Sequence, residues 1–332
     1  MARSLIVLPD DSARPILKAI NQARRMLRLK MFVFTDQTLL AAVLAAKRRG
    51  VQVYIILNSE RRSGEHDNDY TRKALEHADI EVKSGNPAFD VTHEKSLVID
   101  DDTAFVQSLN WAPKNFIETR DYAVVTTHWH DVAEIIEGFE ADWHRQAFEP
   151  RKGSNLLWSP SYARERLVRF IDEAKHHLII QNERFQDMVV IESLVRAAQR
   201  GVKIDVMALR PHTLKKEKLV EGVGGLRIMD DLGIRIHHLK HLKLHAKILL
   251  ADNTAAIVGS INFSAGSFDR RRELSIEIRD EEVVDRLREI VHHDWHHSHA
   301  IDLSEYGLLA DLEERMEESH QLLAIHDRHA GK

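Results

Sequence analysis

The apolar residues of this chain fall alternately into helix-like and strand-like patterns. Apolar positions at helical spacing predict a helix over residues 12–29, and the apolar run that follows predicts a buried strand at 31–34. A second helix is predicted over 39–46, with basic residues in its last turn as the helix dipole favours, and a second strand over 51–57. This alternation predicts an α/β fold in which helices cover the faces of a sheet.

The second half of the chain repeats this pattern. Helices are predicted near 161–177 and 188–200, and strands near 178–182 and 202–208. Three short segments also recur, at offsets of 150, 151 and 152 residues: Ser12-Ala13-Arg14 as Tyr162-Ala163-Arg164, Arg49-Gly50-Val51 as Arg200-Gly201-Val202, and Asp142-Trp143-His144 as Asp294-Trp295-His296. So steady an offset indicates two copies of one unit.

Two homologous units and a tail are therefore the expected domain organisation. The units occupy residues 1–150 and 151–300, and the tail occupies 301–332. Apolar residues at four-residue spacing predict that the tail forms an amphipathic helix, which docks on its own unit or on a second subunit.

Composition excludes several classes of protein. Of the 332 residues, 43% are hydrophobic and 30% are charged, which is the balance of a soluble globular chain, and no apolar run approaches the roughly 18 residues of a membrane-spanning helix. The net charge of −5 argues against a protein that coats nucleic acid, although one cleft can still be basic. With 21 histidines and no cysteine, any nucleophile must come from other residue types, and disulfides and thiolate-bound zinc are excluded.

One constellation of polar residues occurs twice, once in each unit. His93-Glu94-Lys95 with Asp100 has the spacing His-x-Lys-x-x-x-x-Asp, and His245-Ala246-Lys247 with Asp252 repeats it 152 residues later. The surroundings repeat as well: Ser108 and Asn110 match Ser260 and Asn262, and Asp121 matches Glu273. Either tripeptide alone is a weak signal, whereas two copies at equivalent positions indicate a functional site.

The flanking sequences predict how these residues point. Apolar strand sequences follow each His-x-Lys, and alternation places the histidine and the lysine of each copy on one face. Asp100 and Asp252 fall on the opposite face, so we expect them to be structural. Ser108 and Asn110 share a face on the next predicted strand, 103–109, so both are expected to face the same site as the His–Lys pair.

The duplicated constellation resembles the two HKD motifs of the phospholipase D superfamily, and the resemblance covers both units. It implies two homologous α/β sandwich halves, each a mixed sheet flanked by helices, related by a pseudo-twofold axis. It also implies that both sets of catalytic residues converge on one phosphate, and that a phosphodiester is cleaved or transferred through a covalent phosphohistidine, with no metal and no cofactor. The catalytic residues that it implies are His93, Lys95, Asn110, His245, Lys247 and Asn262.

The chemistry of these residue types fits that implication. The lysines and asparagines can stabilise the nonbridging oxygens, while one neutral imidazole attacks phosphorus and the other, protonated, donates to the leaving oxygen. We expect Asp121 and Glu273 each to orient an imidazole through its other nitrogen. Family precedent assigns the nucleophile to His93, and the near-symmetry of the motifs leaves the reverse assignment open. Gln107 stands where the family usually has glycine, which puts in question how closely the backbone of the first unit approaches the phosphate.

The substrate is less well defined by the sequence. The segment from Asn262 to Phe268 is most similar to the phospholipase D and bacterial cardiolipin synthase branch, which implies a phospholipid substrate reached peripherally at a membrane. On that reading Trp111 and Phe263 shape an acyl-accepting rim, and Arg271 and Arg272 hold a second anion of the substrate. The alternatives are a metal-independent nuclease acting on DNA or RNA, and a noncatalytic scaffold that binds anionic lipid or nucleic acid.

Three remaining expectations concern segments and location. The histidines of 292–299 have a spacing that could hold a metal, but they overlap a repeated segment and are expected to belong to a terminal packing helix. Residues 211–216 are a candidate lid over the cleft. The protein is expected in the cytoplasm or at a membrane surface, and export after removal of a leader stays open.

Overall fold

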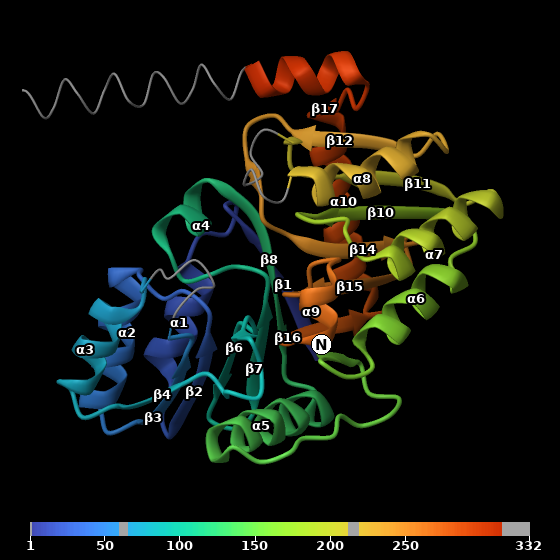
Figure 1. Cartoon of the computed structure of the whole chain (residues 1–332). Coiled ribbons are helices and arrows are strands. Elements are labelled where there is room, and N and C mark those ends of the chain that lie inside the picture. Colours follow the sequence, from blue (N-terminus) through green and yellow to red (C-terminus); the bar gives the residue numbers. More distant parts are fainter. Residues whose placement is uncertain (1, 60–65, 212–218, 314–332) are drawn as a thin grey trace, which may run out of the picture.

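Two mixed β-sheets, one per half of the chain, stand side by side with helices on their outer faces (Figure 1). The structure is a computed structural model and describes residues 2–59, 66–211 and 219–313. The candidate lid over 211–216 therefore lies, apart from Pro211, outside the described residues. The expected α/β architecture with two repeated units is confirmed.

The first sheet has the strand order β1-β8-β7-β6-β2-β3-β4, and five helices follow its strands. Its strands are β1 (Arg3–Leu8), β2 (Met26–Met31), β3 (Gln52–Leu57), β4 (Glu81–Ser84), β6 (Ser96–Ile99), β7 (Thr103–Gln107) and β8 (Thr119–Thr126). The helices are α1 (Arg14–Gln22), α2 (Gln37–Arg48), α3 (Asp69–Glu76), α4 (Pro113–Ile117) and α5 (Trp129–His144).

The second sheet repeats this plan in the order β17-β12-β11-β10-β14-β15-β16-β5, with β9 also paired to β16. Its strands are β5 (Val91–Thr92), β9 (Leu156–Ser159), β10 (His177–Asn182), β11 (Lys203–Met207), β12 (Arg235–Leu239), β14 (Lys247–Ala251), β15 (Ala255–Gly259), β16 (Arg271–Ile278) and β17 (Ser298–Ala300). The helices are α6 (Ala163–Glu173), α7 (Met188–Gln199), α8 (Leu219–Asp230), α9 (Ala265–Asp269) and α10 (Glu281–His296).

Each half lends one short strand to the sheet of the other. Strand β5 comes from the first half but pairs with β16, and β13 (Lys243–Leu244) comes from the second half but pairs with β8. Both short strands lie just before a His-x-Lys segment. The two exchanges therefore carry each of these segments to the border between the halves.

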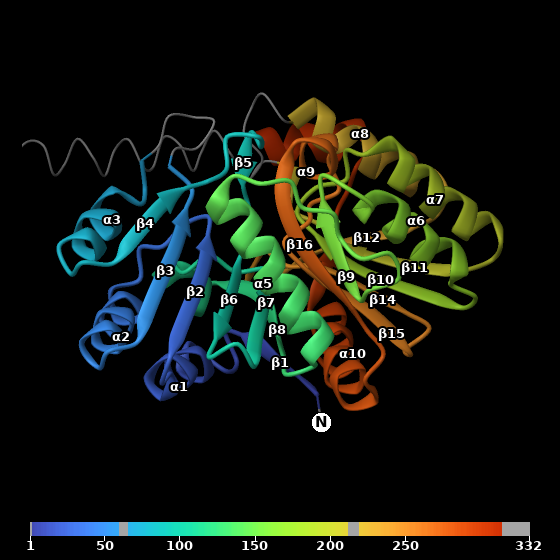
Figure 2. The same ribbon diagram turned by 90° about the horizontal axis from the view of Figure 1, so that it is seen from below.

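The cores follow from alternation along the strands. In β1, Ile6 packs outward in one core with helices α1, α2 and α3, whereas Leu5 and Val7 pack inward in a shared core between the sheets. In β14, Leu249 packs outward with α6, α7 and α8, and its neighbours pack inward. Because both faces of each sheet are covered, the central strands are nearly continuous apolar runs. Figure 2 shows the outer helices on opposite sides of the paired sheets.

Two predicted helices and one predicted strand had wrong boundaries. The helix expected over 12–29 ends at Gln22, and the strand expected at 31–34 is β2, Met26–Met31. Met26 and Leu27 lie at helical spacing from Ile16 and Ile20 only by coincidence, since β2 pairs along its length with β3 and β6. The other predicted elements agree with the observed ones to within a few residues, except that the helix expected over 161–177 is shorter, Ala163–Glu173.

The C-terminal part of the described chain packs on the second half. A helix covers residues 305–313, Leu303 is buried in the outer core of the second half, and Leu308 packs against that core. In α10, Trp295 stacks on His237 of β12 with ring centroids 4.0 Å apart, which is a packing contact. Across 2–59, 66–211 and 219–313, no helix combines the length and apolar character needed to span a bilayer.

Candidate active site

The two His-x-Lys segments reach the border between the halves because the backbone of each is attached to the opposite sheet. The N–H of His93 donates to the carbonyl of Arg272 at the start of β16, and the N–H of His245 donates to the carbonyl of Arg120 in β8, at 2.9 and 3.2 Å. Each segment then returns to its own sheet, as β6 or β14. Each histidine is thus fixed to the half that does not contain it in sequence.

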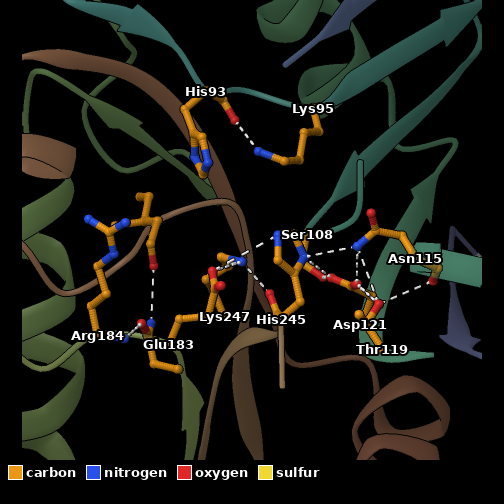
Figure 3. A network of polar contacts seen from close by, with 12 residues as sticks. His93, Lys95, Ser108, Asn115, Thr119, Asp121, Glu183, Arg184, His245 and Lys247 are labelled. Atoms are coloured by element: carbon orange, nitrogen blue, oxygen red, sulfur yellow. Dashed lines mark hydrogen bonds and ion pairs between the residues drawn. The ribbon is translucent and has the colours of Figure 1, made fainter. Parts of the chain in front are cut away.

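Both imidazoles contact a carboxylate of the opposite half. Nδ1 of His93 lies 2.8 Å from Oε2 of Glu273, and Nδ1 of His245 lies 2.8 Å from Oδ1 of Asp121. Both carboxylates are fully buried. An imidazole held through Nδ1 has Nε2 left for chemistry, and its tautomer and orientation are set by the carboxylate. Figure 3 shows His93 and Lys95 facing His245 and Lys247 across one small region.

The side-chain nitrogen of each lysine donates a hydrogen bond to the backbone carbonyl of the histidine in its own motif. Nζ of Lys95 donates to the carbonyl of His93 at 2.6 Å, and Nζ of Lys247 donates to the carbonyl of His245. Lys95 is 1% exposed and Lys247 is 2% exposed, so both ammonium groups are held without bulk water. Such desolvated cations interact strongly with any anion that enters the site.

The charges of the site perturb several pKa values. Burial lowers the pKa of His93 well below its usual value, and Lys95, Arg271 and Lys247 lower it further. Burial also lowers the pKa of Lys95 to about 7, although the carboxylate of Glu273 opposes this. The effect of Lys247 on His93 shows that groups from both halves act on the same small volume. A cluster of buried groups with shifted pKa values is typical of a catalytic site.

Asp121 and Glu273 respond in opposite directions. Burial alone would raise the pKa of Asp121, but His245 and Lys247 lower it to about 2. For Glu273 burial prevails and raises the pKa, despite the charge of Lys95. The two imidazole–carboxylate pairs are therefore electrostatically unequal.

The two asparagines lie in the same region with unused hydrogen-bonding capacity. Asn110 and Asn262 are 8% and 2% exposed, and the Oδ1 atom of each makes no hydrogen bond. A buried polar atom without a partner is rare in proteins unless a ligand or water supplies one. These amides are therefore suited to contact a ligand.

The serines contact the site carboxylates as well as the backbone, and the motif aspartates hold backbone turns. Ser108, which was expected to face the site, donates to Oδ1 of Asp121 at 2.6 Å, and Ser260 donates to the carbonyl of Leu274 at 3.2 Å. Asp100 accepts hydrogen bonds from the backbone N–H groups of residues 24–26, and Asp252 accepts them from those of 175–177. Both aspartates close the turn before the central strand of their half.

The structure does not support a substrate contact for three of the predicted residues. Arg272 is 4% exposed and forms a bidentate ion pair with Asp142 at 2.9 and 2.8 Å. Trp111 and Phe263 are 0% and 1% exposed and pack edge-on against other core aromatics, so neither forms an acyl-accepting rim. Arg271 remains a candidate, because its charge acts on both His93 and Glu273.

The difference between Gln107 and Gly259 has a structural cause. A Cβ on Gly259 would collide with the backbone of Ser275 on the neighbouring strand β16. Gln107 faces the smaller Ala123 in the same register, and its Oε1 accepts a hydrogen bond from Trp111 at 3.1 Å. The glycine of the second half therefore serves strand packing.

Sequence reasoning missed four residues around the two carboxylates and lysines. Asn115 and Thr119 donate to Oδ2 of Asp121 at 3.1 and 2.6 Å. Glu183, at the end of β10, contacts Lys247, while Phe32 at the end of β2 packs edge-on against His93. A comparison of the two repeats would have found the last pair, because Phe32 and Glu183 stand at equivalent positions, two residues beyond Lys30 and Gln181.

The chain belongs to the family described as "Cardiolipin synthase, PLD-like domain", whose model matches residues 16–143 and 167–295. The two matches cover both halves of the structure and include both His-x-Lys segments. The phospholipase D resemblance of the sequence is thereby confirmed.

Among individual proteins, the chain is 24% identical to cardiolipin synthase A of Pectobacterium carotovorum over 82% of its length and 64% of that protein's. It is 25% identical to cardiolipin synthase B of Escherichia coli, over 82% of this chain and 75% of that protein. A structure titled phosphatidylserine synthase, from Haemophilus influenzae, superimposes with a TM-score of 0.71 at 11% identity, over 97% and 93% of the two chains. The chain thus spans about two thirds to three quarters of the two cardiolipin synthases.

Proposed function

We propose that this protein transfers or hydrolyses the head group of a phospholipid, through a phosphohistidine intermediate and without a metal ion. The observation that carries the proposal is the convergence of two imidazole–carboxylate pairs and two buried lysines, one set from each half. A single half holds only one of the two imidazoles, and each imidazole depends on a carboxylate of the other half. The two halves therefore act as one centre.

The first step is attack by a neutral imidazole on phosphorus. Burial and the neighbouring cations keep His93 neutral, since they lower its pKa well below the usual value, and Glu273 holds its Nδ1. Nε2 of His93 is then free to form an N–P bond. The bond from phosphorus to the leaving oxygen breaks, and His245 donates a proton to that oxygen.

In the second step His245 acts as a base, and the phosphoryl group passes from His93 to water or to an alcohol. The now neutral His245 takes a proton from water or from an alcohol, the resulting oxygen nucleophile attacks phosphorus, and the N–P bond to His93 breaks. Water gives hydrolysis, and an alcohol gives head-group transfer. Asp121 stabilises the charged form of His245 when it carries the proton.

Lysine and asparagine side chains take the part that a metal ion plays in other phosphodiesterases. Lys95 and Lys247 place two ammonium groups in a dry site, and Asn110 and Asn262 carry side-chain N–H groups that can donate to the same oxygens. Donors placed in advance around the nonbridging oxygens stabilise the charge of the transition state. Positive charge and hydrogen bonds are thus supplied by the chain itself.

A phospholipid is favoured as substrate by the names of the similar proteins. Two are called cardiolipin synthases and one is called phosphatidylserine synthase. The substrate would be reached peripherally at a membrane surface. The same centre could in principle open the phosphodiester of a nucleic acid, so the assay that tests the proposal includes both substrates.

The test is an assay in EDTA with phosphatidylcholine, phosphatidylglycerol and single-stranded DNA as parallel substrates. We expect release of choline or glycerol, or formation of a transferred lipid, and a loss of about three orders of magnitude or more in kcat in His93→Ala and in His245→Ala, since general acid–base catalysis alone contributes 10²–10⁴-fold. Shortening of DNA without turnover of lipid would show that the substrate is a nucleic acid and not a phospholipid. Activity that is lost in EDTA and restored by a divalent ion would refute the metal-free mechanism.

The intermediate can be trapped separately. Substrate labelled in its phosphate should leave a covalent label that survives alkali, as expected for a phosphohistidine. We expect His93→Ala to abolish this label. With a substrate whose leaving group departs without a proton, such as p-nitrophenolate, His245→Asn should let the label accumulate, because release of the intermediate still needs the base. A label that persists in His93→Ala would reverse the roles of the two histidines.

A further inference from the structure

The two half-sites differ at one position that the repeat makes equivalent. Strands β2 and β10 occupy corresponding places in the two sheets, each between a parallel neighbour and an antiparallel one. The second residue beyond Lys30 of β2 is Phe32, and the second beyond Gln181 of β10 is Glu183. One half thus presents an aromatic ring to the site where the other presents a carboxylate.

Each of these residues contacts the His–Lys pair of its own half. The ring of Phe32 meets His93 edge-on with centroids 4.7 Å apart, and Nζ of Lys95 lies 5.2 Å from the same ring. Oε2 of Glu183 lies 2.5 Å from Nζ of Lys247 and 4.0 Å from Nε2 of His245. Figure 3 shows Glu183 beside Lys247, on the side of the site opposite His93 and Lys95.

The surroundings of the two imidazoles differ in charge as a result. His245 is faced by Asp121 from β8 at Nδ1, by Glu183 from the end of β10 at Nε2, and by Lys247 from β14. His93 is contacted by the carboxylate of Glu273 and by the Phe32 ring. The charges of Lys95, Arg271 and Lys247 also act on it, and that of Glu183 acts in the opposite sense with a smaller effect. Opposite charges within about 4–6 Å favour the charged form of a titrating group.

Glu183 is itself suited to carry a negative charge. Burial would raise its pKa, but Lys247 and His245 lower it to about 2, so the group is a carboxylate at any physiological pH. The side chain is 21% exposed and contacts Lys247. Substrate contact is not required for its effect.

We propose that Glu183 is a positioning residue that makes the two half-sites unequal: its carboxylate holds Lys247 and stabilises protonated His245, so that His245 is the proton donor and His93, beside Phe32, is the nucleophile. This inference rests on the proposed function, which it deepens by giving the assignment of the two roles a structural cause. In the step concerned, Nε2 of His93 forms the bond to phosphorus, the P–O bond of the leaving alcohol breaks, and the proton of His245 Nε2 passes to that oxygen. Every atom and proton is supplied by the chain and the substrate.

The first measurement is the titration of the His245 ring by NMR in the free protein, with the signal assigned through His245→Asn. We expect Glu183→Gln to lower the titration midpoint of His245 by about one pH unit or more, because an opposite charge near the ring is removed. Glu183→Asp should keep most of the wild-type midpoint. Glu192→Gln, which changes an exposed glutamate of the same half paired with Arg196, is the matched control and should leave the midpoint unchanged.

The second measurement is the pH–rate profile on the phospholipid substrate. In Glu183→Gln the alkaline limb of kcat/KM, which reports the free enzyme, should move down by the same interval as the NMR midpoint. The loss in kcat/KM should therefore be about tenfold or more greater at pH 8 than at pH 6. A residue that served only to support the fold would lower kcat by one factor at every pH. Glu183→Asp should restore most of the wild-type limb.

The outcomes separate this inference from the proposed function. An unshifted His245 midpoint, or a shifted midpoint with an unmoved alkaline limb in an active enzyme, would overturn the role of Glu183 while leaving the proposed function standing. A wild-type protein that turns over neither phospholipid nor nucleic acid would overturn the proposed function first. A matching shift in both measurements supports the inference.

Discussion

Lys95 lies in an environment very different from that of a surface lysine. Its side-chain nitrogen is desolvated and donates to the carbonyl of His93, and burial lowers its pKa to about 7. Lys247, its repeat partner, contacts the carboxylate of Glu183 in addition to the carbonyl of its own histidine, His245. The free site therefore gains or loses one positive charge near neutral pH, and an anion that binds beside Lys95 favours the charged form.

This predicts that anion binding to the free protein depends on pH around 7. Lys95 is protonated below that pH and loses its charge as the pH rises through it, so the affinity for sulfate, which does not itself titrate there, should fall by up to about tenfold per pH unit above 7. Isothermal titration calorimetry from pH 6 to 9 measures this. Lys95→Arg, which stays charged, should bind with a much flatter profile; an equally steep one would show that another group is responsible.

At the scale of an element, the turns before β2 and β10 depend on one carboxylate each. Asp100 follows β6 with a left-handed backbone (φ 53°) and receives the N–H groups of Arg24, Arg25 and Met26, which places the start of β2 beside the end of β6. Asp252 repeats this with φ 52°. Although burial opposes it, these hydrogen bonds lower the pKa of Asp100 below its usual value.

Asp100→Ala is accordingly predicted to destabilise the protein by about 1–2 kcal/mol, the typical effect of removing a side chain that caps backbone N–H groups. The loss should be seen as a lower urea midpoint. Because the folded pKa is depressed, the stabilisation is complete above the unfolded pKa, about 4, and is lost as the pH falls through the folded value. Asp102→Ala, in the same turn, is the control, and an equal effect there would contradict the role assigned to Asp100.

At the scale of the whole molecule, two buried ion pairs join the halves. Arg272 of β16 holds Asp142 of α5, and Arg120 of β8 holds Asp294 of α10, each through two hydrogen bonds of 2.8–2.9 Å. The recurring Asp-Trp-His segments of the sequence are the helix ends that supply these aspartates. Both arginines lie next to the residue that pairs with an imidazole, so the same strands join the halves and shape the site.

Removing one of these ion pairs is expected to lower the stability of the fold more than the catalytic activity. Arg272→Met leaves the buried Asp142 with Lys30 as its remaining cation and is predicted to reduce stability by about 3–5 kcal/mol, measured by urea unfolding. Arg270→Met is the matched control, since Arg270 also bridges the halves, to Asp90, but is 51% exposed at its side chain, and it should change stability by less than about 1 kcal/mol. Normal stability with a raised KM in Arg272→Met would instead restore Arg272 as a substrate ligand.

Much of the element pattern could be predicted from the chain, and the errors have physical causes. Strands β3, β6, β10 and β11 were predicted within a few residues, because runs buried on both faces are apolar and bounded by turns. The predicted first helix was too long. Hydrophobic periodicity does not show that the backbone N–H groups of residues 24–26 donate hydrogen bonds to Asp100. Arginines and aromatics near the motif were taken for substrate ligands because their partners lie far away in the sequence.

The sequence by itself determined that this is a duplicated α/β chain with two equivalent His–Lys–Asn sets, since a repeat and a fixed spacing are local properties that survive without coordinates. Only the tertiary structure decided which carboxylate serves which histidine: the strand exchange of β5 and β13 sends His93 to Glu273 and His245 to Asp121. It also decided that Phe32 and Glu183 make the two half-sites unequal. The reason is that hydrogen bonds and charges act over a few ångströms in space, between residues that are 61 to 180 positions apart along the chain.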